Sequence, residues 1–210
     1  MSVCIKRMFD LFLSIFLLIV LSPILTLIAI LIKLNSKGPV LFKQVRVGED
    51  SKLFKIYKFR TMVKNSSKNR CDYNLCKGDS KITYVGNFLR KWSLDELPQL
   101  INIIKGEMSF IGPRPTLEYQ VKQYNDFQRK RLNMKPGITG WAQVNGRNSL
   151  TWEERIYYDV CYVMNFSLSL DFEIFIKTIK VMLLKEGIYG KHGINYDFSL
   201  KDNLKIKKVI

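Results

Sequence analysis

The stretch at residues 11–32, LFLSIFLLIVLSPILTLIAILI, decides the fold, because it carries no charged residue between Asp10 and Lys33. As a helix with a rise of about 1.5 Å per residue it is about 33 Å long, enough to cross the hydrocarbon core of a bilayer. Ser22 and Pro23 interrupt the run near its midpoint. A proline lacks the backbone N–H and leaves the carbonyl four residues earlier without a donor, so we predict a kink or a break there. The Ser22 hydroxyl is expected to bond back into the preceding turn and satisfy part of what Pro23 frees.

Basic residues flank this apolar run on both sides: Lys6, Arg7, Lys33, Lys37, Lys43 and Arg46. Basic residues next to a membrane segment tend to stay on the cytoplasmic side. Both ends therefore belong on one side of the membrane, which favours a re-entrant helix-break-helix. An ordinary kinked span with its N-terminal tail outside is the alternative. A cleaved secretory signal fits least, because the apolar part exceeds the roughly 7–15 residues of such signals and no small-x-small cleavage site follows it.

Length and charge predict one domain beside this anchor. The chain has 210 residues, with 34 Lys and Arg against 18 Asp and Glu, and a formal net charge of +16. Such a charge attracts polyanions, and the membrane segment favours lipid headgroups and phosphorylated substrates over nucleic acid. No internal repeat or long linker marks a second domain. We expect a membrane anchor at 1–36, one domain at 37–190 and a basic C-terminal tail at 191–210.

The four cysteines predict neither export nor a zinc site. Cys71 and Cys76 form the one close pair, and the single histidine, His192, lies far from them in the sequence. This spacing does not match a pattern of zinc ligands. We expect ordinary reduced thiols.

Two stretches rich in β-branched and aromatic residues predict a β-hairpin. They are residues 40–47 and 53–62, and the turn-forming sequence GEDS at 48–51 separates them. Because side chains alternate along a strand, Lys58 and Arg60 share one face of the second stretch. That face is either a solvated basic surface or part of a phosphate-binding site.

The remaining pattern is mainly helical, so the predicted fold class is mainly α with a small β-hairpin and surface amphipathic helices. Helical periodicity covers residues 116–134 and 170–185. Thr151 and Glu154 have the spacing of a capping box at the start of another helix. The helix at 170–185 either lies on the membrane surface or packs on the core. Residues 65–80 are polar and predict a surface loop.

The stretch RKWSLDELPQL at 90–100 is the strongest candidate for chemistry. Ser93 and Glu96 have capping-box spacing, and acidic residues suit the first turn of a helix, so a helix start explains them without any catalytic role. With Ser93 as N-cap, however, Pro98 falls at the fifth helical position, where its missing N–H should have bonded Leu94. Local rules that disagree in this way are more common at functional sites than elsewhere.

Two stretches rich in proline and glycine carry further arginines. In GPRP at 112–115 the flanking prolines fix the backbone around Arg114. In PGITGWAQVNGRN at 136–148 three glycines accompany Arg147, and the backbone of such a loop can approach a ligand closely. The basic run RKR at 129–131 is expected to be a solvated or membrane-facing patch rather than a ligand site.

Several long motifs in a fixed order make the chain resemble a known protein family. With the Ser-Pro break, YKFRTM, SLDELPQL, KGEMSFIGPRP and PGITGWAQVNGRN, the chain resembles the bacterial sugar transferases, the monotopic phosphoglycosyl transferases that act on polyprenyl phosphate. The similarity runs from Lys6 to Lys185. It implies transfer of a sugar 1-phosphate from a UDP-sugar to undecaprenyl phosphate with release of UMP, as the first membrane step of surface glycan assembly.

The resemblance also implies the parts of the site. It places a covalent intermediate on Asp95, with Glu96 as the second catalytic residue, and it implies Mg2+ held by these two carboxylates. It makes residues 37–190 the catalytic domain. The re-entrant anchor is expected in the cytoplasmic leaflet of the bacterial inner membrane, where it contacts membrane lipids.

The chemistry of the residues agrees with this role. A carboxylate can act as a nucleophile on phosphorus. Its attack on a diphosphate brings like charges together, and at 4 Å with an effective dielectric constant near 20 each pair repels by roughly 4 kcal/mol. Cations must offset this repulsion, and arginine can bind phosphate through two parallel hydrogen bonds. We expect the substrate phosphates and nucleotide to be bound by Arg90, Arg114 and Arg147, with Lys58 and Arg60 behind them.

Two other classes of protein stay open at this point. A glycosyltransferase that forms a glycosidic bond would usually show an Asp-x-Asp metal motif, and the sequence has none. A non-catalytic adaptor on anionic membrane explains the charge and the anchor, but it gives no reason for an Asp-Glu pair among three separated arginines. The product separates these classes, because glycosyl transfer releases UDP and phosphoglycosyl transfer releases UMP.

Overall fold

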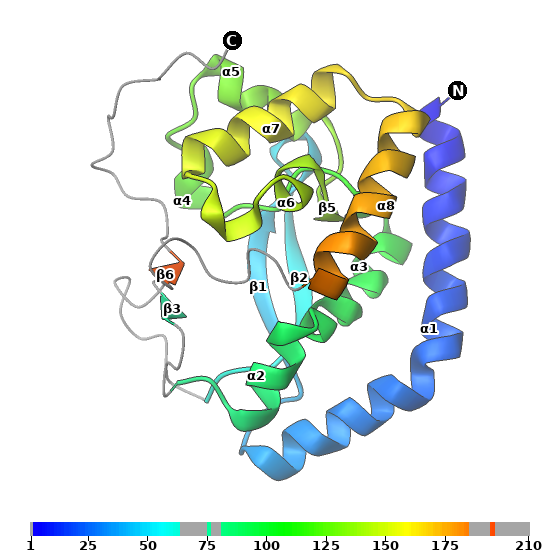
Figure 1. The fold of residues 1–210 in the computed structure, drawn as a ribbon, viewed down its shortest axis with the longest axis vertical. Coiled ribbons are helices and arrows are strands. Elements are labelled where there is room, and N and C mark those ends of the chain that lie inside the picture. The colour runs from blue at the N-terminus through cyan, green and yellow to red at the C-terminus, as the bar shows by residue number, and fades with distance from the viewer. Residues whose placement is uncertain (1, 64–74, 77–80, 185–193, 196–210) are drawn as a thin grey trace.

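The computed structural model describes residues 2–63, 75–76, 81–184 and 194–195 (Figure 1). The α-helices are α1 Ser2–Asn35, α2 Tyr84–Lys91, α3 Leu100–Lys105, α4 Glu118–Val121, α5 Asp126–Arg129, α6 Trp141–Val144, α7 Trp152–Met164 and α8 Leu168–Leu184. The strands are β1 Leu41–Val47, β2 Leu53–Phe59, β3 Leu75–Cys76, β4 Ser109–Ile111, β5 Gly137–Thr139 and β6 Ile194–Asn195. The 3-10 helices are η1 Glu49–Ser51, η3 Leu94–Gln99, η4 Lys130–Asn133 and η5 Arg147–Ser149. The predicted fold class, mainly α with a small β-hairpin, is confirmed.

The predicted β-hairpin is formed by β1 and β2, which pair antiparallel with Leu41 opposite Phe59. The second strand ends at Phe59, earlier than predicted, because the chain then leaves β1 and Met62 makes an isolated bridge with Ile82 instead. The connection is the 3-10 helix η1, in which Asp50 has a left-handed backbone with φ 54°. The two other pairs of strands are short: β4 runs parallel to β5, and β3 runs antiparallel to β6.

The buried core lies between the hairpin and the helices that follow it in the sequence. Phe54 of β2 packs with Leu100 and Ile103 of α3. Val47 at the end of β1 packs with Ile156 of α7. Each such side chain, when fully buried, contributes about 1.5–3 kcal/mol to folding. This packing fixes β2 against the segment that contains the Asp-Glu pair.

Helix α1 contains Pro23 and turns sharply about midway along its length (Figure 1). The Ser22 hydroxyl donates a hydrogen bond to the carbonyl oxygen of Ile19 at 2.8 Å. Ile19 lies four residues before Pro23, so its carbonyl is the one that the proline leaves without a backbone donor. The predicted kink and the predicted back-bond of Ser22 are both confirmed.

Both ends of α1 are bound to the same globular domain. Near the N-terminus Lys6 Nζ lies 2.6 Å from Asp171 Oδ2 of α8. At the other end the guanidinium of Arg60 donates to the carbonyl oxygen of Ser36 at 2.7 Å. A straight helix of 34 residues would separate its ends by roughly 50 Å. The bend brings both ends to the domain, as the re-entrant prediction requires and a straight span does not.

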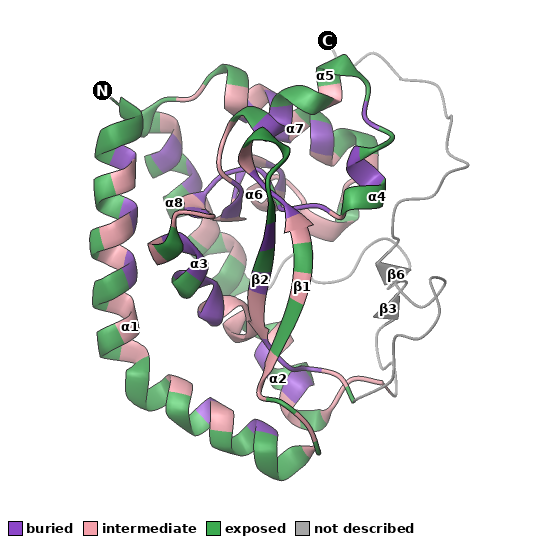
Figure 2. Cartoon of the chain, turned by 180° about the vertical axis from the view of Figure 1, so that it is seen from behind, coloured by how far each residue is buried: buried purple, intermediate pink, exposed green. Residues whose placement is uncertain are grey.

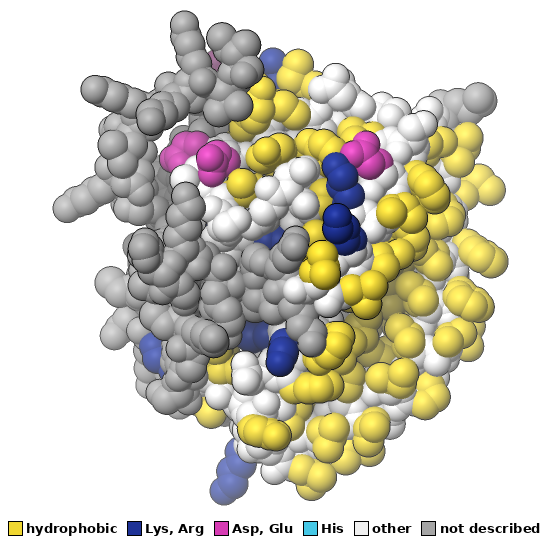
Figure 3. Space-filling model, viewed as in Figure 1, with side chains coloured by type: hydrophobic (Ala, Val, Ile, Leu, Met, Phe, Trp, Pro, Cys, Tyr) yellow, Lys and Arg dark blue, Asp and Glu magenta, His cyan; other side chains and the backbone are white. Residues whose placement is uncertain are grey.

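In the first half of α1 the polar side chains face the domain and the apolar side chains face outward, which is the reverse of an ordinary surface helix. The side chains buried against the domain are polar, namely Lys6, Asp10 and Ser14. The outward side exposes large apolar side chains such as Met8 and Phe12, each 72% exposed (Figures 2 and 3). Among the described residues α1 is the one helix long and apolar enough to cross a membrane. An apolar surface around a polar inner face suits a helix surrounded by lipid.

Helix α8 has one of the two placements expected for the predicted helix at 170–185, because it packs on the core; the placement on the membrane surface stays a prediction. Ile174 is fully buried in the core with Ile111 and Tyr162. Phe172 and Leu183, on other sides of the helix, are 68% and 69% exposed. The helix therefore packs on the core and also presents an apolar surface, and the helix itself runs beside α1 (Figure 1).

The prediction of a single helix at 116–134 is wrong, because this stretch forms three short helical pieces: α4, α5 and η4. Asn125 is the N-cap of the second piece, because its side chain accepts a hydrogen bond from the backbone N–H of Gln128 at 2.9 Å. The N-cap of the first piece is Leu117, and the carbonyl of Thr116 before it accepts a hydrogen bond from the N–H of Val47 at the end of β1. An N-cap signal inside an apolar period thus divides the helix.

The other helix start predicted from a capping box is confirmed. Thr151 accepts a hydrogen bond from the N–H of Glu154, and the Glu154 side chain accepts one from the N–H of Thr151 at the start of α7. Cys4 and Cys161 are free thiols in the described part of the chain. The predicted loop at 65–80 and the tail at 191–210 lie outside the described residues except for β3 and β6.

Candidate active site

Asp95 and Glu96 lie on η3, between α2 and α3. The capping box predicted at Ser93 is wrong: Ser93 has a left-handed backbone with φ 55°, and within the described residues its side chain caps no helix N–H. The tight 3-10 turn resolves the conflict with Pro98, because the α-helix begins only at Leu100. The disagreement between the local rules marked a real irregularity in the backbone.

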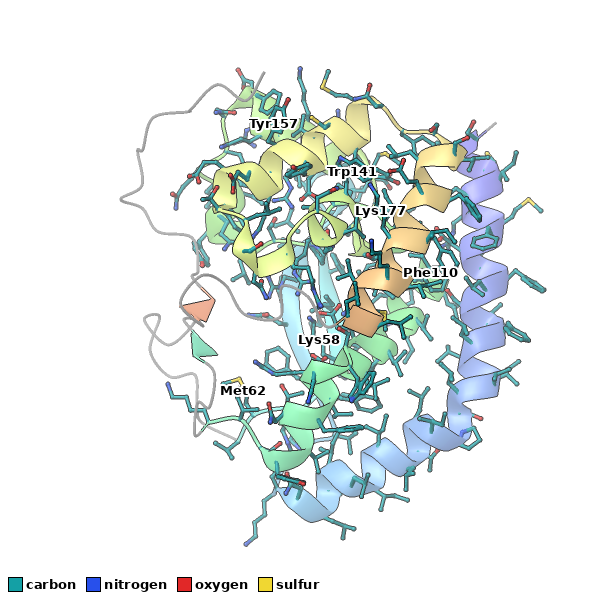
Figure 4. The ribbon with its side chains drawn as sticks, viewed as in Figure 1. Lys58, Met62, Phe110, Trp141, Tyr157 and Lys177 are labelled. Atoms are coloured by element: carbon teal, nitrogen blue, oxygen red, sulfur yellow. The ribbon has the colours of Figure 1, made fainter. Side chains whose placement is uncertain are left out.

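Glu96 is the meeting point of two cations. Lys58 Nζ donates to Glu96 Oε1 at 2.6 Å, and Arg114 Nη2 donates to the same oxygen at 3.2 Å. Lys58 comes from β2 and Arg114 from the segment between β4 and α4. Figure 4 shows Lys58 on the inner side of the bent α1. The structure thus brings together three predicted site residues from three separate parts of the chain.

The two neighbouring carboxylates differ in their electrostatic state. Burial raises the pKa of Asp95, and the negative charge of Glu96 raises it further. Burial also acts to raise the pKa of Glu96, but Lys58 and Arg114 outweigh it and hold that pKa well below its usual range. A nearby cation favours a carboxylate's charged form, and a nearby anion disfavours it. Glu96 is therefore held ionised by its partners, while Asp95 is the more basic of the two.

Arg90 reaches the site from α2. Its Nε donates to Thr61 Oγ1 at 2.8 Å, and its positive charge acts to lower the pKa of Asp95. Helix α2 comes this close to the end of β2 because Gly86 has no side chain. A Cβ atom at that position would lie 2.1 Å from the carbonyl oxygen of Thr61. One glycine therefore permits the close approach of α2, the helix that carries Arg90, to Thr61.

Arg147 approaches the site from η5. Its Nη2 donates to Ser93 Oγ at 3.2 Å. Burial lowers the pKa of Arg147, and the positive charge of Arg114 lowers it further. The chain turns here through two left-handed residues, Gly146 with φ 145° and Arg147 with φ 49°. The three arginines predicted to bind phosphate therefore surround the carboxylate pair.

Comparison with known proteins identifies the family of the chain. The family model described as bacterial sugar transferase matches residues 1–185. The chain belongs to the bacterial sugar transferase family. The match covers the bent anchor as well as every residue of the carboxylate and arginine cluster.

Three relatives of this sugar transferase illustrate the range of similarity. The uncharacterized sugar transferase EpsL of Bacillus subtilis is 46% identical over 87% of this chain and 89% of its own length. The undecaprenyl-phosphate galactose phosphotransferase of Salmonella typhimurium is 42% identical over 88% of this chain and 41% of its own length. The UDP-glucose:undecaprenyl-phosphate glucose-1-phosphate transferase of Escherichia coli is 41% identical over the same two shares. The chain thus spans about two fifths of the length of the last two proteins.

Two glycines of the sugar transferase at 136–148 let two stretches of backbone approach each other closely. A Cβ on Gly137 would lie 2.2 Å from the backbone nitrogen of Gly112, and one on Gly140 would lie 2.1 Å from its carbonyl oxygen. The close approach observed is therefore between two stretches of backbone, and an approach to a ligand stays a prediction. It lets β5 pair with β4 immediately before the segment that carries Arg114.

Arg60 is placed at the end of α1 rather than with Lys58. Its guanidinium donates to the carbonyl oxygen of Ser36 at 2.7 Å, to Ser36 Oγ at 2.9 Å and to the carbonyl oxygen of Ile32 at 3.4 Å. A cation that bonds the last carbonyls of a helix stabilises its C-terminus. The observed role of Arg60 is to bind the anchor to β2, and its part in phosphate binding stays a prediction.

Sequence reasoning missed a buried ion pair behind the site. Arg131, assigned to an exposed patch, is 3% exposed and is paired with Asp159 of α7. The sequence did hold a signal, because Asp159 lies on the same face of α7 as Ile156 and Val160. A carboxylate on an apolar helix face requires a buried cation as partner.

Asp95 and Glu96 fit a divalent cation as part of its coordination shell. In the part of the chain that the structure describes, no group of three or more His, Cys, Asp or Glu side chains is placed to hold a metal ion. Mg2+ at phosphoryl-transfer sites is commonly bound by one or two carboxylates, with water and substrate phosphates as the other ligands. Two adjacent carboxylates, one with its pKa raised by the other, suit such a cation.

Proposed function

We propose that this sugar transferase moves a sugar 1-phosphate from a UDP-sugar to polyprenyl phosphate and releases UMP. Two of its relatives are named for transfer to undecaprenyl phosphate, one of them from UDP-glucose, which supports both substrate classes. The observation that carries the proposal is the Asp95-Glu96 pair enclosed by one lysine and three arginines. This is the charge arrangement that a nucleophilic carboxylate needs in order to approach a diphosphate.

Asp95 is the nucleophile of the first step. One of its carboxylate oxygens attacks the phosphorus that bears the sugar. A bond forms between that oxygen and the phosphorus, and the bond from the phosphorus to the bridging oxygen of the diphosphate breaks. The bridging oxygen leaves with UMP, and the sugar phosphate stays on Asp95 as an acyl phosphate.

Polyprenyl phosphate is the nucleophile of the second step. A phosphate oxygen of the lipid attacks the same phosphorus, and the acyl-phosphate bond breaks. Asp95 recovers its carboxylate, and the product is a polyprenyl-diphospho-sugar. The covalent intermediate lets one site act first on a water-soluble substrate and then on a membrane lipid.

The cations of the site lower the cost of the first attack. Each unit charge on the diphosphate repels the Asp95 carboxylate by roughly 4 kcal/mol at 4 Å with an effective dielectric constant near 20. Arg90, Arg114 and Arg147 bind the phosphate oxygens and spread this charge. Lys58 stays on Glu96 and keeps the second carboxylate from adding to the repulsion.

Mg2+ is part of the proposal. Asp95 and Glu96 would hold it together with substrate phosphate oxygens, and when bound it supplies positive charge against the phosphoryl group. Arg114 and Lys58 both contact Glu96 Oε1 and so fix the orientation of this carboxylate.

We propose that the anchor holds this chemistry at the cytoplasmic face of the bacterial inner membrane. Basic residues at both ends of α1 favour that side, and the bend keeps both ends at the domain. Burial of the apolar outer side of α1 in one leaflet would put the lipid phosphate level with the domain. The UDP-sugar then reaches the site from the water phase.

The product identifies the reaction. The purified full-length chain is incubated in detergent with a panel of UDP-sugars, polyprenyl phosphate and Mg2+, and UMP and UDP are measured separately. We expect UMP and a lipid-linked diphospho-sugar from the parent protein and no turnover from Asp95→Asn. Release of UDP would show glycosyl transfer, and equal rates for parent and variant would exclude Asp95 as the nucleophile. A chain that releases neither nucleotide from any UDP-sugar would favour the adaptor.

A further inference from the structure

The segment that carries Arg114 is held in place through its carbonyl groups. Pro113 and Pro115 flank Arg114 and contribute no N–H, so the backbone has few donors of its own here. Four successive carbonyls accept hydrogen bonds from outside the segment: Pro113 from Gly137 N, Arg114 from Arg131 Nη2, Pro115 from Arg46 Nη1 and Thr116 from Val47 N. Two of these donors are backbone groups, and two are arginine side chains.

Arg131 is the buried member of this set of donors. It is 3% exposed, and its Nη2 donates to the carbonyl oxygen of Arg114 at 2.9 Å. The same guanidinium is paired with Asp159, which is 1% exposed, and its Nη1 donates to the hydroxyl of Tyr124 at 2.6 Å. The planar guanidinium thus joins α7 and the α4–α5 connection to the backbone of the site.

The side chain of Arg114 has little packing of its own to orient it. It is 49% exposed, and yet its Nη2 lies 3.2 Å from Glu96 Oε1. An exposed arginine side chain has many rotamers, so its working position depends on where the backbone puts its Cα. The hydrogen bond from Arg131 is made to the carbonyl oxygen of that same residue, so it helps to fix the backbone position of Arg114.

We infer that Arg131, held by Asp159 and Tyr124, is a positioning residue that acts on sugar-phosphate transfer through Arg114. The inference rests on the proposed function, in which Arg114 binds the substrate phosphates. Arg131 touches neither carboxylate of the site by any contact that the described residues show. We therefore expect its effect on the reaction to pass through the Gly-Pro-Arg-Pro segment that carries Arg114.

The variant that tests this inference is Arg131→Lys. Lysine keeps the positive charge beside Asp159, but its ammonium is a single point and cannot reach the three separate partners of a guanidinium. We expect kcat/KM for the UDP-sugar that gives UMP in the parent to fall about tenfold. Arg129→Lys, an exposed position in the same basic run, is the control and should match the parent.

A double-mutant cycle with Arg114→Ala separates positioning from general support of the fold. If Arg131 acts through Arg114, Arg131→Lys should cost less than about twofold once Arg114 is already alanine, because interacting residues are not additive. An equal tenfold loss in both backgrounds would mean that Arg131 only supports the fold and would overturn the inference. So would an Arg131→Lys protein as active as the parent.

Tyr124→Phe keeps the inference testable should Arg131→Lys fail to fold. It leaves the ion pair intact and removes one hydroxyl that orients the guanidinium. We expect a loss of about threefold in the parent background and none beside Arg114→Ala; an equal loss in both would overturn the inference.

The same cycle is measured on the affinity for inorganic diphosphate, by thermal shift of the full chain, which requires no turnover. A parent that binds diphosphate but releases no UMP would contradict the proposed function alone. Coupling between Arg131 and Arg114 in diphosphate affinity would still support the positioning role, and additive effects would overturn it.

Discussion

Two adjacent carboxylates in this site have been given opposite properties by the residues around them. Glu96 receives Lys58 and Arg114 on one oxygen, and its pKa is held low. Asp95 is left with the cost of burial and with the repulsion of its neighbour, and its pKa is raised. A higher pKa makes a carboxylate a better nucleophile, while an ionised partner can bind a cation. Groups whose pKa values are separated by their surroundings commonly have separate roles in catalysis.

Asp95→Asn should make the metal-free protein more stable at neutral pH. Because the pKa of Asp95 is raised in the folded state, its ionised form is disfavoured there, and folding loses free energy as the group ionises. Below the unfolded pKa of about 3.9 the group is protonated in both states, so the variant should match the parent there. The difference should grow as the pH rises through the raised folded pKa, and it should be complete above it.

Thermal unfolding of parent and variant from pH 4 to pH 8 in EDTA measures this difference. A gain of about 1 kcal/mol corresponds to a rise in Tm of roughly 2–4 °C for a chain of this size. Asp126→Asn, at an exposed acidic residue on α5, is the control, and its Tm should differ little from that of the parent. A variant that is less stable than the parent at neutral pH would contradict the raised pKa.

Lys58→Met should reduce both activity and stability, and Lys55→Met should not. The two lysines alternate on β2, so that Lys58 points to Glu96 and Lys55 is exposed. Removal of Lys58 leaves a mostly buried carboxylate with Arg114 as its remaining cation in the described contacts. We expect UMP release to fall about 100-fold, the size of effect seen when one charge-stabilising group is removed. Equal effects of the two variants in the UMP assay and in Tm would contradict the assigned pairing.

At the level of elements, the sequence predicted what local chemistry decides. The hairpin follows from strand residues and turn residues, and the start of α7 follows from the Thr151-Glu154 capping box. The bend in α1 follows from Pro23 and the bonding of Ser22. Each of these depends on residues within a few positions of one another, so no knowledge of the tertiary structure was needed.

The errors came where distant contacts override a local pattern. Ser93 has the capping-box spacing, but its hydroxyl accepts from Arg147, which is 54 residues away, and its backbone is left-handed. Arg131 has the sequence context of an exposed patch, but its partner Asp159 is 28 residues away. The arginines near the carboxylate pair were predicted from their chemistry, whereas the pairing of Arg131 with Asp159 had only the signal of a carboxylate on the apolar face of α7.

Gly86→Ala should lower stability and activity together, although glycine to alanine inside a helix normally stabilises by about 0.5–1 kcal/mol. The new methyl group would lie 2.1 Å from the carbonyl oxygen of Thr61, so α2 must move away from β2 and carry Arg90 with it. Such overpacking costs about 1–3 kcal/mol. Asn87→Ala, at the next and exposed position of α2, is the matched control and should keep the activity of the parent. A Gly86→Ala protein with higher Tm and full UMP release would show that α2 does not need this close approach.

At the level of the whole molecule, the anchor is part of the domain rather than an appendage. Lys6 is paired with Asp171, whose other oxygen accepts a hydrogen bond from Tyr162 at 2.6 Å. Arg7 donates to the carbonyl oxygens of Ile103 and Ile104 at the end of α3, the helix that directly follows the segment with Asp95 and Glu96. The position of α1 in the lipid and the position of the site are therefore fixed relative to each other.

This coupling predicts the topology of the chain. If α1 enters and leaves on the cytoplasmic face, the exposed Cys4 should not react with a membrane-impermeant thiol reagent in intact cells, and should react after permeabilisation. The test uses a chain in which the other three cysteines are serine, with UMP release as the check that it still folds. Pro23→Ala restores a backbone donor to Ile19 and removes the cause of the bend, so we expect part of that variant to span the membrane and expose Cys4. Labelling of Cys4 in intact cells expressing the parent would contradict the re-entrant anchor, because the contacts of Lys6 and Arg7 cannot form with the N-terminus on the opposite side of the membrane.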